Sequence, residues 1–174
     1  LLKVVNESSR VQVFVVTANT LVWRRLDLTV RELAKRVHGL RCGLDQAEWV
    51  GDVKPIKCLE ALGATPDDRG ILPFDRGVAH QLYRDLIAPI QPAIAGKRLI
   101  LVPNSQLARL PIQVLLTQPA DADAAWSTLA WLVRDHAVSV VPSVSSLKVL
   151  RTATRAQTGK SRAPYLAVAN PLLS

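Results

Sequence analysis

The sequence predicts an α/β fold, and three patterns indicate it. Two apolar runs, residues 98–102 and 137–141, have the character of buried strands, and each stops at a proline, Pro103 and Pro142. Proline lacks the N–H that a central strand needs, so both strands must end there. Helical apolar stripes alternate with these strands, and the front of the chain has strand-like alternation. We therefore expect a sheet flanked by helices, preceded by a β-hairpin and one helix.

The hairpin is predicted from two neighbouring runs. Residues 11–16 alternate apolar and polar side chains before becoming wholly apolar, and residues 21–26 return after a short polar turn. This is the pattern of two antiparallel strands joined by a tight connection. Residues 1–9 fit either a further strand or the end of a preceding helix, and the sequence leaves both readings open.

A helix is expected directly after the hairpin. Thr29 and Glu32 have the spacing of a capping box, which predicts that the helix begins at the next residue. Gly43 is a natural end for it. Beyond this point the pattern loses its period, because glycines and prolines interrupt residues 44–74. We expect a long connector there, with one short helix around residues 56–62.

The second half of the chain alternates strands and helices. Asp75 is suited to cap a helix whose apolar stripe reaches Ile87, and Ser143 is suited to cap a helix over residues 144–151. Residues 152–163 are polar, basic and contain a glycine, so we expect a flexible surface loop. The organisation expected is one domain in three parts. These are the hairpin and helix (1–43), the irregular connector (44–74) and the α/β part (75–174).

Five short motifs carry a resemblance to a known family. They are Leu82-Tyr83, Leu99–Pro103, Leu110-Pro111, Val141-Pro142-Ser143 and Asn170-Pro171. In order and spacing, across about residues 10–174, the chain resembles the CHAT family, a caspase-like group of cysteine peptidase domains often fused behind helical TPR repeats. Asn104 and Ser105 depart from the family's usual aspartate and glycine. Asparagine tolerates the same backbone geometry, so the departure indicates a change of turn chemistry.

The resemblance implies a caspase-like sheet and, in a complete member, a cysteine peptidase. In such an enzyme imidazole activates a thiolate, and backbone N–H groups stabilise the oxyanion. The family's His-x-Ala-Thr-His-Gly-like segment and its later cysteine have no counterpart among these residues. We therefore expect the N-terminal portion of an incomplete domain, which lacks the catalytic histidine and cysteine and supports a cleft completed by missing sequence. By itself this chain is predicted to be inactive.

The absence of methionine, position 1 included, supports the expectation of a fragment. By resemblance, Asn170 and Pro171 lead into the loop that borders the peptidase cleft, which makes them cleft-proximal candidates without a direct chemical role. No catalytic, cofactor-binding or metal-binding residue is expected within the chain. The remaining polar residues at strand ends have structural readings: Asn104 and Ser105 suit a turn, and Ser143 suits a helix N-cap.

The histidines and cysteines are also expected to be structural. His38 lies on a basic amphipathic helix, His80 beside the apolar stripe of a helix, and His136 at the beginning of a strand, the wrong end for a site. Cys42 lies at a helix C-terminus, where the dipole disfavours a thiolate. We expect Cys42 and Cys58 to be inert, unpaired thiols in a reducing cytoplasm, and leave a disulfide between them as the alternative.

Composition leaves two further functions open. The net charge of +8 is concentrated in residues 1–41 and 97–174, but no nucleic-acid motif accompanies it and aromatic residues make up only 5%. The alternatives are a non-catalytic CHAT-like module for protein interaction and signalling, and a basic polyanion-binding domain. The expected partners are the remainder of the domain, a protein or peptide, and upstream TPR repeats. Nucleic acid is disfavoured, and no apolar run approaches the ~18 residues of a membrane span.

Overall fold

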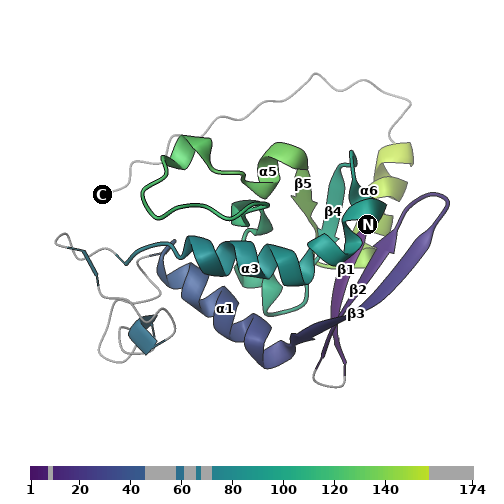
Figure 1. The fold of residues 1–174 in the computed structure, drawn as a ribbon. Helices are drawn as coiled ribbons and strands as arrows, with labels where there is room; N and C mark the ends of the chain where they lie inside the picture. Colours follow the sequence, from purple (N-terminus) through teal and green to yellow (C-terminus); the bar gives the residue numbers. More distant parts are fainter. Residues whose placement is uncertain (8–9, 46–57, 61–65, 68–71, 157–174) are drawn as a thin grey trace, which may run out of the picture. The chain divides into compact units, whose positions relative to one another are not determined.

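The computed structural model describes the chain except for residues 8–9, 46–57, 61–65, 68–71 and 157–174 (Figure 1). The chain divides into two compact units, Leu1–Pro142 and Ser143–Ser174. The first unit contains a sheet and the helices packed on it, and the described residues of the second form one helix. Among the described residues, no helix has both the length and the apolar content that crossing a bilayer requires.

The sheet of the first unit is mixed and has five strands. They are β1 (Leu2–Glu7), β2 (Arg10–Val16), β3 (Leu21–Thr29), β4 (Leu99–Val102) and β5 (Val138–Val140). The spatial order is β3-β2-β1-β4-β5. The strands β1, β2 and β3 pair antiparallel, whereas β1 with β4 and β4 with β5 are parallel. The α/β fold and the hairpin are thereby confirmed, and the opening residues form a strand.

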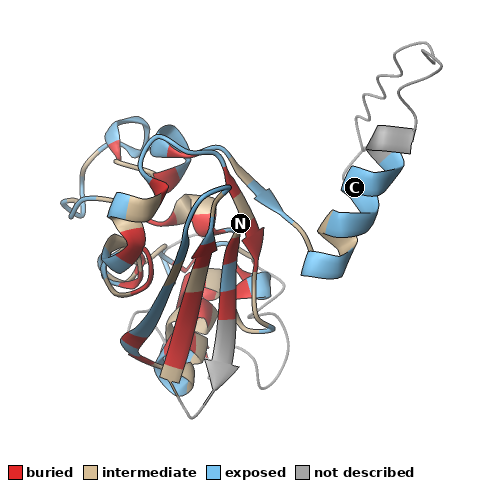
Figure 2. Cartoon of the chain, turned by 90° about the vertical axis from the view of Figure 1, so that its right-hand side faces the viewer, coloured by how far each residue is buried: buried red, intermediate tan, exposed pale blue. Residues whose placement is uncertain are grey.

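The alternation of side chains explains why the front residues form strands. On β2, Val11, Val13 and Val15 are buried, and on β1 Leu2 and Val4 are buried beside them. Residues two apart on a strand point to the same face, so these side chains form one apolar layer. They belong to the same core as the inward faces of the helices. Figure 2 shows the buried strands at the centre of the first unit.

Helix α1 (Val30–Cys42) begins as the sequence predicts. The Glu32 N–H donates to Thr29 Oγ1 at 3.1 Å, and the Thr29 N–H donates to Glu32 Oε2 at 2.8 Å, which completes a capping box. The helix ends at Gly43. A Cβ atom at position 43 would come within 2.6 Å of the Pro73 carbonyl oxygen, so only glycine permits this close approach.

Helix α3 (Arg76–Leu86) is the second large helix of the first unit. As predicted, Asp75 is its N-cap, with Oδ1 accepting a hydrogen bond of 2.8 Å from the Val78 N–H. The short elements η2 (Ala88–Ile90) and α4 (Gln91–Ile94) follow, and they lead into β4. Figure 1 shows α1 and α3 side by side on the same side of the sheet.

The connection from β4 to the parallel strand β5 consists of short helical elements. They are η3 (Leu107–Arg109), η4 (Ile112–Val114), η5 (Trp126–Thr128) and α5 (Leu132–Asp135). An isolated antiparallel bridge joins Leu116 to Trp131, and the Leu132 N–H donates to the Leu115 carbonyl at 2.8 Å. These bonds satisfy backbone groups in a segment that lacks long regular structure.

The second unit contains α6 (Val144–Ala156) among its described residues. The Ser146 N–H donates to Ser143 Oγ at 3.0 Å, which confirms the predicted cap. The prediction that this helix ends at residue 151 is wrong, because the helix continues to Ala156. Alanine and arginine are strong helix formers, and they outweigh the polar, loop-like composition of residues 152–156. The rest of the loop predicted over 152–163 lies outside the described residues.

Candidate functional site

The carboxyl ends of β4 and β5 lie at one edge of the sheet. The two strands are parallel, with Leu101 opposite Val140, so they end side by side. Pro103 and Pro142 follow them, as the sequence predicts. In α/β sheets, ligands bind beyond the carboxyl ends of the strands. Functional side chains are therefore expected at this edge.

Asn104 builds the turn that leaves β4. Its Oδ1 accepts a hydrogen bond of 2.7 Å from the Leu107 N–H, and its carbonyl oxygen accepts one of 2.9 Å from the Ala108 N–H. Ser105 lies within the same turn. The structural interpretation of Asn104 is thus confirmed. Its amide oxygen performs the local capping that Asx side chains provide at turns.

The other candidates that follow strands in the sequence are Ser143, Asn170 and Pro171. Ser143 belongs to the second unit, where its hydroxyl caps α6 and lies 2.9 Å from Ser146 Oγ. Asn170 and Pro171 lie outside the described residues, so their place beside a cleft stays a prediction.

Two of the histidines are held by backbone carbonyl groups. His80 Nδ1 lies 3.1 Å from the Leu116 carbonyl oxygen, and its ring stacks on Tyr83. His136 is buried just before β5, with Nδ1 2.9 Å from the Lys97 carbonyl oxygen. Its Nε2 is buried and makes no hydrogen bond. Both rings are positioned by the fold, and neither lies beside a cysteine.

Tyr83 has a perturbed acidity. Burial raises the pKa of the Tyr83 phenol above 10.0, and the nearby Asp135 carboxylate raises it further. Both causes disfavour a phenolate, since burial desolvates the charge and the carboxylate repels it. Tyr83 is therefore a neutral phenol at physiological pH.

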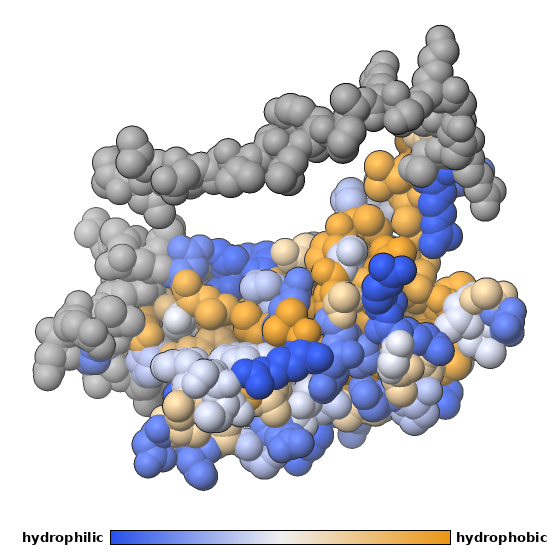
Figure 3. All heavy atoms as spheres, turned by 90° about the horizontal axis from the view of Figure 1, so that it is seen from above, coloured by the Kyte–Doolittle hydropathy of each residue, from blue (hydrophilic) through white to orange (hydrophobic). Residues whose placement is uncertain are grey.

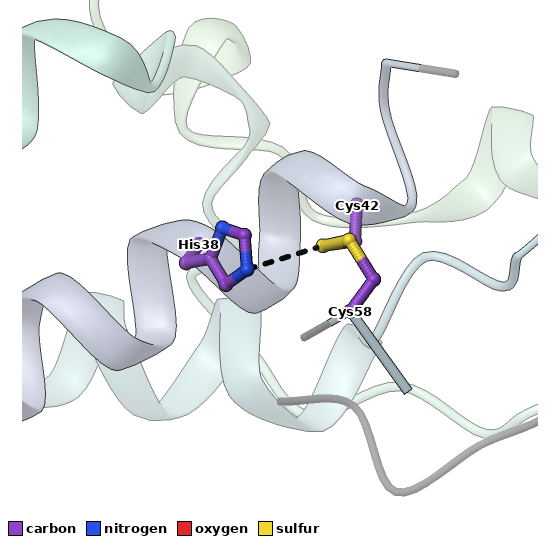
Figure 4. A group of neighbouring side chains, drawn as sticks. All are labelled: His38, Cys42 and Cys58. Atoms are coloured by element: carbon purple, nitrogen blue, oxygen red, sulfur yellow. Dashed lines mark hydrogen bonds between the residues drawn. A yellow bond between two sulfur atoms is a disulfide. The ribbon is translucent and has the colours of Figure 1, made fainter. Parts of the chain in front are cut away.

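The third histidine, His38, lies beside both cysteines, Cys42 and Cys58 (Figure 4). Cys42 and Cys58 form a disulfide, and His38 Nε2 is 3.9 Å from Cys42 Sγ. The prediction of two unpaired thiols is therefore wrong. It relied on the position of Cys42 at a helix C-terminus and on a reducing cytoplasm, and neither reveals that Cys58 lies beside the end of α1.

This histidine–cysteine group lacks the properties of a peptidase nucleophile. The two sulfurs are bonded to each other, and both cysteines are buried, with exposed fractions of 1% and 0%. Cys42 is the last residue of α1, where the negative end of the helix dipole disfavours a thiolate. The i, i+4 spacing of His38 and Cys42 was the sequence signal for this group, because such residues share one helix face.

An aromatic surface lies elsewhere in the first unit, and the sequence did not reveal it. It consists of Phe74, Trp126, Trp131 and Arg76. The two indole rings stack at a centroid distance of 6.1 Å, and the Arg76 guanidinium carbon lies 4.4 Å from the centroid of the Trp126 ring. Trp126 is 54% exposed. We call these four residues the aromatic surface.

A hollow of about 350 Å³ adjoins the aromatic surface. Phe74, Arg76 and Ala120 are among the residues that line it. Figure 3 looks onto the upper side of Figure 1 and shows hydrophobic atoms at the surface among hydrophilic ones. An exposed tryptophan beside an arginine is typical of sites that bind protein or peptide.

One of the comparisons with known proteins identifies a family. The model of the CHAT domain family matches residues 76–174, which is more than half of the chain. The chain belongs to the CHAT family. The matched residues begin at the first turn of α3 and include β4 and β5. No curated protein and no solved structure matches the chain.

The matched part of this CHAT chain contains no cysteine, and its only histidines are His80 and His136. Both are bound to backbone carbonyl groups. His38, Cys42 and Cys58 all precede residue 76, so this group lies outside the matched part.

Proposed function

We propose that this CHAT chain forms one flank of a caspase-like cysteine peptidase domain, to which residues outside these 174 supply the catalytic histidine and cysteine. One observation carries the proposal. The family match covers a parallel strand pair, β4 and β5, whose carboxyl ends lie together, yet the matched residues contain no cysteine. The chain thus has the frame on which such a site is built without its nucleophile.

The contacts of the three histidines support the proposal that the catalytic histidine comes from residues outside these 174. The rings of His80 and His136 contact backbone carbonyl oxygens, and His38 lies beside a buried disulfide. A general base needs a nucleophile within hydrogen-bonding reach, and no free thiol lies near any of these rings among the described residues.

In the proposed domain, this chain supplies the rigid scaffold of the site and none of its catalytic residues. The turn held by Asn104 fixes the path of the backbone where it leaves β4. A rigid edge of this kind would hold the catalytic imidazole and thiolate at a constant separation, which is what nucleophilic catalysis requires. Asn170 and Pro171 would border the cleft.

The test compares two proteins, the 174-residue chain and the product of the intact reading frame that encodes it. Both are incubated with a mixed peptide library, with and without a thiol-alkylating reagent, and cleavage is followed by mass spectrometry. We expect cleavage by the intact product that alkylation abolishes, and none by the 174-residue chain. Thiol-dependent cleavage by the shorter chain would overturn the proposal.

A second candidate function, a non-catalytic interaction module, is favoured by the aromatic surface. Tryptophan and arginine dominate binding energies at protein interfaces, and Trp126 exposes half of its surface beside Arg76. If the intact product cleaves nothing, this function becomes the leading one. Trp126→Ala should then weaken binding of peptides selected on the wild-type chain, whereas Leu21→Ala, which removes an exposed side chain of β3, should leave it unchanged.

Polyanion binding is the third candidate, and only the net charge of +8 supports it. Contacts to phosphate groups release counterions, so true binding weakens steeply with salt. Titration with duplex DNA at two salt concentrations decides this. An affinity that falls steeply with salt yet remains measurable at physiological salt would support polyanion binding, and no measurable affinity at either salt concentration would exclude duplex DNA as the partner.

A further inference from the structure

We propose that His38, Cys42 and Cys58 form a redox-controlled zinc site. In the disulfide state the group cannot bind metal, and in the reduced state the two sulfurs and His38 Nε2 become three zinc ligands. The proposal is independent of the peptidase function, because all three residues lie outside the part of the chain that matches the CHAT family.

The first support is the distance between the ligand atoms. One ligand atom from each of the three residues lies within 4.8 Å of the others, and His38 Nε2 is 3.9 Å from Cys42 Sγ. Tetrahedral zinc, with Zn–S and Zn–N bonds of about 2.3 and 2.0 Å, places nitrogen and sulfur ligands about 3.5 Å apart. The separation of His38 Nε2 from Cys42 Sγ is therefore already within about half an ångström of that in a tetrahedral site, and Cys58 Sγ lies no more than 4.8 Å from the nitrogen.

The second support is how the backbone presents these side chains. His38 and Cys42 are one turn apart on α1, so they project from the same helix face (Figure 4). Cys58 opens the short helical stretch 58–60 and approaches the end of α1, with a Cα–Cα distance of 5.7 Å to Cys42. Two ligands thus come from a rigid helix and one from a separate segment. Once the S–S bond is broken, the sulfurs need to part to only about 3.8 Å.

The third support is the electrostatic setting. Cys42 is the last residue of α1, and the negative end of a helix dipole favours a cation there. Cys42 and Cys58 are buried with Leu72 in a small apolar cluster of their own. A free thiolate would be disfavoured in this place, but zinc with two thiolates is electrically neutral, so its burial costs far less.

The ligand set indicates which metal would bind. Two thiolates and one imidazole form a soft-to-borderline donor set, which is typical of zinc and unsuited to magnesium or calcium. His38 is only partly buried, so a water molecule is able to reach the fourth position of the tetrahedron. No carboxylate completes the group among the described residues.

The proposed switch is a two-electron exchange between a dithiol and the Cys42–Cys58 bond. A dithiol reductant transfers two electrons and two protons to the Cys42–Cys58 bond, which gives two thiols and leaves the reductant as a disulfide. Zinc then forms bonds to both sulfurs and releases the two thiol protons. Neutral His38 donates the lone pair of Nε2. In the reverse step a small disulfide accepts two electrons from the thiolates and leaves as two thiolates, which restores the Cys42–Cys58 bond and frees the zinc ion.

The experiment titrates zinc ions against the chain in competition with a chromophoric chelator. The chain is measured oxidised and then reduced with a phosphine, which breaks disulfides without adding thiol ligands. We expect one zinc ion per reduced chain and none per oxidised chain. Cobalt ions added to the reduced chain should give the visible bands of tetrahedral thiolate coordination.

Variants test each ligand separately. Loss of groups that only support a ligand lowers metal affinity about 10- to 100-fold, so His38→Ala should lower zinc affinity at least about 100-fold. It leaves the disulfide intact, so its oxidised form serves as a check of folding. Cys42→Ser with Cys58→Ser should abolish binding. His80→Ala is the matched control, because His80 is also a helical, partly buried histidine. The His80→Ala variant should bind zinc as the wild type does.

Several results would overturn the proposal. These are equal zinc affinity in the oxidised and reduced chains, unchanged affinity in His38→Ala, or no binding by a reduced chain whose circular dichroism shows that it is folded. The last result would leave a purely structural disulfide. Lost affinity in His80→Ala as well would equally contradict a site specific to His38.

Discussion

Arg36 Nη1 of α1 lies 2.6 Å from Asp85 Oδ2 of α3, and this ion pair links the two helices through residues 49 apart in sequence. Both side chains are mostly buried, with exposed fractions of 18% and 26%. A partly buried pair is screened less than one in water, so it contributes more than most surface ion pairs. The pair therefore orients α1 on α3 within the first unit.

Breaking this pair should destabilise the protein measurably. We expect a coupling energy of about 1 kcal/mol between Arg36→Ala and Asp85→Ala, from a double-mutant cycle followed by urea denaturation. The control is the pair Arg10–Asp27, which joins β2 and β3 with a far more exposed carboxylate. Its coupling energy should be smaller. Equal coupling energies in the two cycles would contradict a special role for burial.

The capping box of α1 makes stability depend on pH. Hydrogen bonds from the Thr29 side chain and backbone lower the pKa of Glu32 below its ordinary value of 4.5. A group with a depressed folded pKa stabilises the protein above its unfolded pKa, and loses that contribution as pH falls through the folded pKa. Stability should therefore decline below about pH 4.5 in the wild type, and less so in Glu32→Gln.

Removal of the cap hydroxyl should also weaken the helix. Thr29→Ala should cost about 1 kcal/mol of unfolding free energy, whereas Thr29→Ser, which retains the hydroxyl, should cost much less. Equilibrium denaturation at neutral pH measures both. A Thr29→Ser variant as unstable as Thr29→Ala would show that the methyl group, rather than the cap, is responsible.

Leu82 tests the core beneath α3. Its side chain is completely buried, so Leu82→Ala removes apolar contacts and leaves a cavity, at a cost of about 2–5 kcal/mol. Leu21→Ala is the control, because Leu21 on β3 is 68% exposed. Thermal denaturation should show a large loss for the first variant and almost none for the second. A small effect at Leu82 would place α3 outside the cooperative core.

Arg76 should order the loop that precedes Trp126. Its Nη1 donates hydrogen bonds to the Asp121 and Ala124 carbonyl oxygens, at 2.6 and 2.8 Å. Arg76→Ala should therefore speed hydrogen exchange at residues 120–126. Arg84→Ala, on the same helix but 65% exposed, should leave that exchange unchanged. Faster exchange in both variants would indicate a general loosening of α3 instead.

The Cys42–Cys58 bond should stabilise the oxidised chain by itself. The two cysteines are 16 residues apart, and closing a loop of that length removes chain entropy worth about 3 kcal/mol from the unfolded state. Reduction without metal should lower the melting temperature, and the Cys42→Ser/Cys58→Ser variant should match the reduced chain. Saturating zinc should then raise the melting temperature of the reduced wild type only, since a ligand that binds the native state stabilises it.

The sequence by itself determined the elements whose causes are local. The capping box of Thr29 and Glu32, the N-cap Asp75, the end of α1 at Gly43 and the strand that stops at Pro103 all follow from neighbouring residues. So do the hairpin and the turn at Asn104, because period and turn chemistry act within a few residues. The family was also predicted correctly, since its motifs are short segments in a fixed order.

Only the tertiary structure decided the pairings between residues that are far apart in the sequence. It joined Cys58 to Cys42 beside His38, and it brought Arg76 to Trp126. The position of β1 between β2 and β4 is of the same kind. No local pattern specifies these pairings, because each requires the chain to close a loop whose entropic cost is repaid only by the packing of the whole unit.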